Sequence, residues 1–135
     1  MASFSKVNSF VENLAEKFID LSGAALTVAL TNTAHTSTWD ELADLTEVGY
    51  TNLSSRVITV STSAQTSGTY KLVCADLTLT ASGSVGPFRY VYIYDDGSTG
   101  DKLICYYDYG SSITLNSGDT FKLDFDGSAG VLTIS

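Results

Sequence analysis

The residues of this chain that could perform catalysis are few, and their spacing assembles no familiar active site. The sequence contains one histidine, His35, in a polar stretch without a nucleophile motif, and we expect it to be a solvated loop residue rather than part of a triad. Asp124 and Asp126 share one face of a strand pattern and could act as a glycosidase pair, but outward carboxylates usually serve solubility. With no zinc-ligand spacing and no phosphate-binding glycine loop, the sequence predicts neither an enzyme nor a bound cofactor.

A second candidate for chemistry is the acidic loop at residues 95–101, with the sequence DDGSTGD. Its carboxylates and flexible glycines offer the hard oxygen ligands that calcium prefers, although the spacing differs from that of an EF-hand loop. Asp and Gly are also common in hairpin loops without an ion, because they tolerate left-handed backbone geometry. The sequence leaves both interpretations open.

Tyrosines dominate the two strand patterns that flank this loop. If Tyr94 pairs with Leu103, the simplest register gathers the aromatic side chains on one face. The residues of this face are Phe88, Tyr90, Tyr92, Tyr94, Tyr107 and Tyr109. The opposite face is aliphatic and ends with Arg89 directly across from Asp108, an opposite-charge pair of the kind that stabilises neighbouring strands. We do not expect both faces to meet water.

Three kinds of neighbour could cover the second face of this hairpin. The N-terminal helix of the same chain could pack on it, with the sandwich core on the other side. Another copy or a partner could bind there, since tyrosine is enriched at interfaces for its contact area and polar tip. A sugar could also stack on a few exposed rings. We adopt the interface as the working hypothesis and assign the aromatic face to self-contact.

Composition limits the partners. The chain has 135 residues, enough for one domain, residues 1–135, with one core. Its net charge of −8 with only seven Lys and Arg residues argues against nucleic acid and against anionic membranes. No apolar run approaches the length of a membrane span, and Glu12, Glu16 and Asp20 interrupt the apolar positions of the N-terminal region. We therefore expect no signal peptide and synthesis in a cytoplasm.

The N-terminal segment, residues 1–23, has the spacing of an amphipathic helix. Its apolar stripe consists of Phe10, Val11, Leu14, Phe18 and Leu21. Ser9 and Glu12 fit a capping box, and Gly23 follows as a stop signal. One such helix cannot bury its stripe alone, so it must lie on the domain's sheet or on another protein.

Residues 24–135 alternate in the manner of short strands separated by turns. Strands are expected near residues 26–30, 56–61, 69–81, 88–94, 103–109, 113–115, 120–126 and in the closing segment after Gly130. A helical turn capped by Thr38 and Glu41 interrupts them. This pattern favours a β-sandwich or barrel with one leading helix. We expect Cys74 and Cys105 to be buried hydrophobic residues, and a disulfide would require neighbouring strands with matching Cβ directions.

Several runs of this sequence resemble a family of small structural proteins of tailed bacteriophages. The likeness is strongest after Gly86 and covers most of the chain. The runs are GPFRY at 86–90, YDYGSSITL at 107–115, FDGSAGVL at 125–132, LTVALTNT at 26–33, LADLTE at 42–47 and GTYKL at 68–72. They are patterns of strands and turns rather than catalytic motifs, so they indicate a family better than a role.

The resemblance implies a jelly-roll β-sandwich that acts as a capsid decoration, or cement, protein of a short-tailed phage. Such a protein lies on the outer surface of the virion and bridges neighbouring subunits of the major capsid protein. A homo-oligomer is expected, with a dimer favoured over a trimer because twofold contacts are the commonest closed symmetry. We assign contact with the shell to the N-terminal stripe. Its residues are Phe4, Val7, Phe10, Val11, Leu14 and Phe18.

Two alternatives stay open. The chain could be a glycan-binding module of a tail fibre or host-adhesion protein, with Tyr90 and Tyr92 in contact with the sugar. It could also be a tail or connector component, structural but located elsewhere on the particle.

Overall fold

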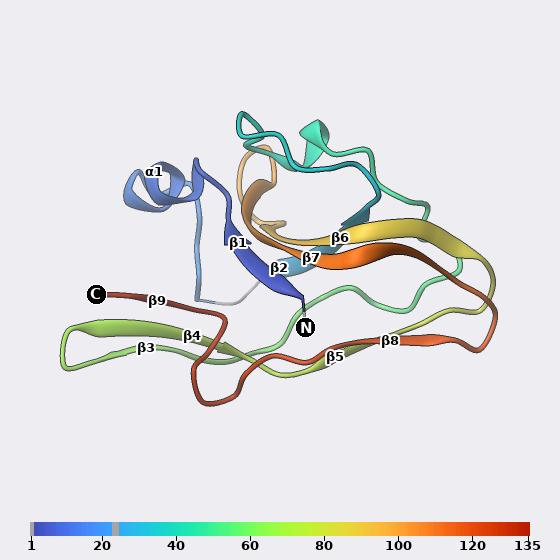
Figure 1. The fold of residues 1–135 in the computed structure, drawn as a ribbon. Helices are drawn as coiled ribbons and strands as arrows, with labels where there is room; N and C mark the ends of the chain where they lie inside the picture. The colour runs from blue at the N-terminus through green and yellow to red at the C-terminus, as the bar shows by residue number, and fades with distance from the viewer. Residues whose placement is uncertain (1, 23–24) are drawn as a thin grey trace.

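The structure is a computed structural model that describes residues 2–22 and 25–135. It is mainly β, with antiparallel sheets and one short α-helix (Figure 1). The elements in chain order are β1 (Ser3–Lys6), α1 (Phe10–Ala15), β2 (Leu26–Thr31), the 3-10 turn η1 (Leu42–Asp44), β3 (Val60–Thr66), β4 (Thr69–Cys74), β5 (Leu77–Thr80), β6 (Val85–Asp95), β7 (Lys102–Leu115), β8 (Thr120–Leu123) and β9 (Leu132–Ile134).

The strands form two layers with the core between them. One layer is a four-stranded sheet of order β1-β7-β6-β2, and the other contains the sheets β3-β4-β9 and β5-β8, which run beneath it in Figure 1. The largest fully buried side chains include Tyr92, Phe88, Leu26, Leu30, Ile58 and Leu72. The predicted β-sandwich is confirmed, whereas this strand order does not establish the jelly-roll topology.

The N-terminal segment differs from the predicted long helix. Residues Ser3–Lys6 form strand β1, which pairs with β7, and the helix spans only Phe10–Ala15. It ends because Lys17 adopts a left-handed φ of 71°, which lets the Phe18 amide donate to the Asn13 carbonyl at 2.8 Å. Ser9 occupies the N-cap position without a side-chain cap, so the predicted capping box is wrong. The predicted stop at Gly23 lies outside the described residues.

Two predicted strands have different bounds in the structure. The pattern at 69–81 is divided into β4 and β5, which belong to different sheets, because Ala75 and Asp76 leave the ladder between them. The pattern at 56–61 makes only a bridge between Val57 and Thr27 before β3 begins at Val60. The predicted helical turn is present as η1, but its capping box joins Glu41 and Asp44 rather than Thr38 and Glu41.

Both cysteines are buried in the core as free thiols, as predicted. Burial raises the pKa of the Cys74 thiol to about 11 and also raises the pKa of Cys105. Both side chains therefore act as small hydrophobic residues. Across residues 2–22 and 25–135, the structure contains no helix with the length and apolar character needed to cross a membrane.

Candidate binding surface

The hairpin of β6 and β7 contains a β-bulge that changes the pairing of every residue beyond it. Tyr94 pairs with Leu103 as predicted, but the next pair is Ile93 with Cys105, so Ile104 is the extra residue. Because side chains alternate between the faces of a strand, one extra residue exchanges the faces of all later partners. The pairings predicted for the rest of the hairpin are therefore wrong.

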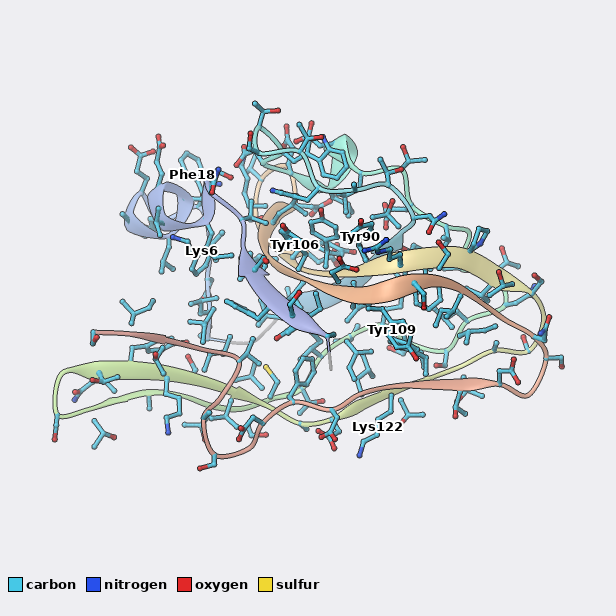
Figure 2. The ribbon with its side chains drawn as sticks, viewed as in Figure 1. Lys6, Phe18, Tyr90, Tyr106, Tyr109 and Lys122 are labelled. Atoms are coloured by element: carbon cyan, nitrogen blue, oxygen red, sulfur yellow. The ribbon has the colours of Figure 1, made fainter. Side chains whose placement is uncertain are left out.

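The predicted aromatic face is consequently divided between the two sides of the sheet. Tyr92 pairs with Tyr106, and Val91 pairs with Tyr107, so Tyr107 lies on the side opposite Tyr92. Figure 2 shows Tyr106 above the hairpin and Tyr109 below it. The tyrosines of this hairpin therefore lie in two separate environments, one on each side of the sheet.

Most of the residues assigned to self-contact are covered by the protein itself. Phe88, Tyr92 and Tyr94 are buried, and Tyr90 and Tyr107 are half-buried. Only Tyr109, with 47% of its surface exposed, is a large exposed residue among them. The prediction that these residues form a single aromatic contact face is therefore wrong.

On the covered side, an aromatic cluster lies beneath the loop that follows β2. We call it the covered cluster; it consists of His35, Trp39, Tyr92 and Tyr106. His35 Nδ1 and the Tyr92 hydroxyl share a hydrogen bond of 2.9 Å, and the imidazole stacks on Tyr106 with ring centroids 4.5 Å apart. Trp39 meets His35 edge-on at 5.6 Å. Burial lowers the pKa of His35 and raises the pKa of Tyr92, so the expected solvated histidine is instead a packed residue.

Arg89 and Asp108 form the predicted ion pair, although the register differs. The Nε–Oδ1 and Nη2–Oδ2 distances are 2.8 Å and 3.0 Å, so the contact is bidentate. Tyr90, not Arg89, lies directly opposite Asp108, and Arg89 reaches the carboxylate from the adjacent position. The guanidinium holds the pKa of Asp108 below its usual range.

On the other side, the sandwich stays open along one edge. Two adjoining hollows of about 840 Å³ and about 720 Å³ share Phe4, Gly130 and Val131 in their linings. The first lies between β1, α1 and β9, and the second lies between β1, β7 and β8. We call this combined surface the edge groove. Its most exposed large apolar side chains are Phe4 (44%), Val11 (51%), Tyr109 (47%) and Ile134 (41%).

Three strand edges border the edge groove. Strands β1, β8 and β9 each lie at the margin of their sheet, and within residues 2–22 and 25–135 none of them has a second strand neighbour. An edge strand presents unpaired backbone N–H and C=O groups, and many proteins protect such edges with charge or proline. Strand β9 (Leu132–Ile134) contains neither. Strands β1 and β8 each contain one lysine, Lys6 and Lys122, but all three edges still present unpaired backbone groups with which another chain can pair.

The residues assigned to shell contact are divided between the groove, the core and another surface. Phe4 lies on β1 and packs edge-on against Tyr107, with ring centroids 5.6 Å apart. Val7 and Phe10 are buried in the core, so they cannot touch a partner extensively. Val11 and the half-buried Leu14 line the groove. Phe18 lies beside α1 (Figure 2) and is absent from the lining of both hollows.

Charge is unevenly distributed along the edge groove. The charged side chain in the lining beside α1 is Lys6, whereas Lys122, Asp124 and Asp126 line the part beside β8. Lys122 Nζ binds the Asp76 carboxylate at 2.9 Å. The Ala129 and Ser128 amides donate to Asp126 and lower the pKa of its carboxyl group. The β8 end is therefore acidic, and the α1 end carries little charge.

The acidic loop at 95–101 uses its first carboxylate internally. Asp95 is buried, and its two oxygens accept the backbone N–H groups of Asp20 at 2.8 Å and Gly97 at 3.0 Å. Gly100 and Asp101 adopt left-handed φ values of 81° and 53°, as the turn interpretation expects. In the described part of the chain, no group of three His, Cys, Asp or Glu side chains is arranged to hold a metal ion.

Comparison of this chain with protein-family models, with curated proteins and with solved structures finds no match.

Sequence reasoning missed the residues that complete the edge groove. Ile134 belongs to the short closing strand β9 and Val131 directly precedes that strand, and Phe121 contacts Phe88 and Tyr109 at ring-centroid distances of 5.3 Å and 5.5 Å. The alternation of the closing strand predicted its existence but not its position at a margin. Gly130 carried a signal, because a glycine before an apolar run can mark close backbone approach.

Proposed function

We propose that this protein is a capsid decoration, or cement, protein that binds the outside of a bacteriophage head and stabilises contacts between major capsid subunits. The edge groove is the observation that carries this proposal. Exposed apolar side chains are gathered there beside unpaired strand edges, and such a patch usually marks contact with another macromolecule. The sequence runs at 86–90 and 107–115 that resemble phage decoration proteins suggest the partner.

The remaining surface suits the exterior of a virion. The chain has a net charge of −8, and β3 (Val60–Thr66) is rich in exposed Ser, Thr and Gln. A polar surface with a net charge far from zero favours solubility and limits non-specific association. Negative charge would also keep the protein away from packaged DNA.

The direct test adds purified protein to heads assembled without it. We expect saturable co-sedimentation and a higher temperature for DNA release from the decorated heads. Heads that are already saturated provide the control for non-specific binding. Failure to bind, or binding that leaves heat and osmotic-shock resistance unchanged, would contradict the cement proposal.

Self-association remains part of the proposal, without an assigned surface. A twofold dimer is favoured on symmetry grounds, but the burial of Phe88, Tyr92 and Tyr94 removes them from any self-contact. Sedimentation equilibrium over a range of concentrations measures this property. A strictly monomeric protein, both free and on the head, would contradict it.

A glycan-binding module is the second candidate, and the partly exposed side chains of the half-buried Trp39 and Tyr106 favour it. Tyr92 is fully buried and cannot contact a sugar, so the earlier assignment of Tyr92 is wrong. Glycan-array binding that is lost with Trp39→Ala, together with no binding to heads, would favour this candidate. Binding to isolated tails instead of heads would favour a tail or connector component.

A further inference from the structure

The free edge of β1 directs particular backbone groups into the edge groove. The Val7 amide donates to the Ile104 carbonyl at 3.1 Å, so Val7 belongs to a hydrogen-bonded pair with β7. Bonded and non-bonded pairs alternate along an antiparallel ladder. The N–H and C=O groups of Phe4 and Lys6 therefore point away from β7, where no other strand of the described residues receives them.

An apolar surface lies beside these backbone groups. It is formed by Val11 and Leu14 from α1, by Val131 and Ile134 at β9, and by the Phe4 ring itself. Strand addition needs both features, because main-chain hydrogen bonds provide affinity and apolar pockets accept alternate side chains. The edge groove is therefore built for an extended chain rather than for a small polar ligand.

Charge indicates which kind of chain can bind in the edge groove. In the edge groove, a second copy of this protein would bring a net charge of −8 beside the acidic β8 end, which opposes docking of that copy at this surface. Asp124 and Asp126 line the β8 end of the groove, and the ammonium group of Lys122 is paired with Asp76. A partner strand with a cationic residue at that end complements the groove.

We infer that one extended segment of the major capsid protein docks on β1 as an added strand and closes the open side of the sandwich. The segment carries apolar side chains at alternate positions and a lysine or arginine beside Asp124 and Asp126. The inference rests on the proposed function, which supplies the shell as the source of the strand. Docking pairs the backbone of Phe4 and Lys6 and covers the exposed side chain of Val11.

The test measures amide hydrogen exchange at Phe4 and Lys6 in two complexes. The first is the protein bound to heads assembled without it. The second contains a synthetic peptide of about ten residues, with alternating valine and threonine and a terminal lysine. We expect exchange at both amides to slow by about tenfold or more in each complex. The control peptide has the same side chains but a backbone N-methylated at alternate residues, and it should give no protection.

Each outcome separates the inference from the proposed function. Binding to heads without protection at Phe4 and Lys6 would overturn strand addition and leave the decoration role standing. Protection by the peptide without binding to heads would support strand addition and overturn the shell as its source. No protection in either complex would overturn the inference entirely.

Two further comparisons test the occupant. Protection that rises with protein concentration in the absence of heads and peptide would identify a second copy as the occupant and overturn the inference. Replacing the terminal lysine of the peptide by glutamate should weaken binding by about threefold or more, since like charges then meet at Asp124 and Asp126. Equal affinity of the two peptides would contradict the placement of a cationic residue beside Asp124 and Asp126.

Discussion

The covered cluster and the edge groove lie on opposite sides of the same four-stranded sheet, and both are rich in aromatic and apolar residues. On one side, the loop that follows β2 covers the sheet (Figure 1), and its His35 and Trp39 rings contact Tyr106 and Tyr92. On the other side, hollows separate β1 and α1 from β8 and β9, and Phe4 stays 44% exposed. The two sides differ in what covers them rather than in composition.

This difference separates aromatic residues that stabilise the fold from those that can bind a partner. Tyr92 has no exposed surface, whereas Tyr109 is 47% exposed, although both belong to the same hairpin. A tyrosine-rich hairpin is therefore not a contact face in itself. Substitutions that act on only one side can test this division.

The largest effect is expected for Tyr92→Ala, which should lower the free energy of unfolding by about 3–5 kcal/mol because it empties a fully buried ring site. Tyr109→Ala is the matched substitution on the open side. It should cost about 1 kcal/mol or less, since the exposed ring loses mainly its contact with Phe121. Chemical denaturation of both variants measures the difference. An equal loss of unfolding free energy in the two variants would contradict the proposed difference between the covered and the open side.

The next effect is expected for Gly130→Ala, where backbone strain costs about 1–3 kcal/mol and a steric clash adds to that cost. Gly130 has φ +81°, and an added Cβ would lie 2.6 Å from the Leu72 carbonyl oxygen. The control is Gly118→Ala, at φ +90° with nothing within 4 Å. Thermal unfolding should show the larger loss for Gly130→Ala. The same loss in both variants would mean that β9 does not need this close approach.

A smaller, pH-dependent effect is expected from His35. Burial lowers its pKa in the folded state below the ordinary value of 6.5, so the unfolded chain accepts a proton first as the pH falls. This contribution to stability is therefore complete above pH 6.5 and is lost as the pH falls toward the lowered folded pKa. Denaturation of wild type and His35→Gln at several pH values isolates this slope. An NMR titration that gives His35 an ordinary or raised pKa would contradict its packed position.

The smallest effect is expected for the Arg89–Asp108 pair, because its side chains are 38% and 29% exposed and solvent screens the attraction. The pKa of Asp108 is lowered in the folded state, so the stabilisation is present above the carboxyl's unfolded pKa and disappears as the pH falls through the folded one. The stability difference between wild type and Arg89→Gln should shrink over that acidic range. A difference that stays constant with pH would show that Arg89 acts through packing.

The sequence predicted the β-sandwich because alternation and turn residues report strands directly. It did not predict the bulge at Ile104, because both faces of the β6–β7 hairpin are apolar and a slip of one residue exposes nothing polar to the core. The predicted helix is too long because the apolar stripe continues to Leu21, whereas Lys17 ends the helix through its backbone geometry. Local patterns carry no signal for such a change.

The candidate site was predictable only in part. Phe4 and Val11 were named as contact residues from one stripe, and the structure places both at the edge groove. Val7 and Phe10 belong to the same stripe but are buried, because the chain changes from strand to helix between Phe4 and Val11. The groove also needs β9, whose neighbours are set by long-range pairing with β4.

The claim that the edge groove is the docking surface is tested most directly by the same substitution at two matched valines. Val11 and Val57 are 51% and 55% exposed, but only Val11 lines the groove. The measurement is the affinity of Val11→Asp and Val57→Asp for heads assembled without the protein, after denaturation confirms similar stability. We predict that Val57→Asp binds like wild type and that Val11→Asp binds at least about tenfold more weakly, as expected for a residue central to an interface. Equal affinity of the two variants would contradict docking through the edge groove.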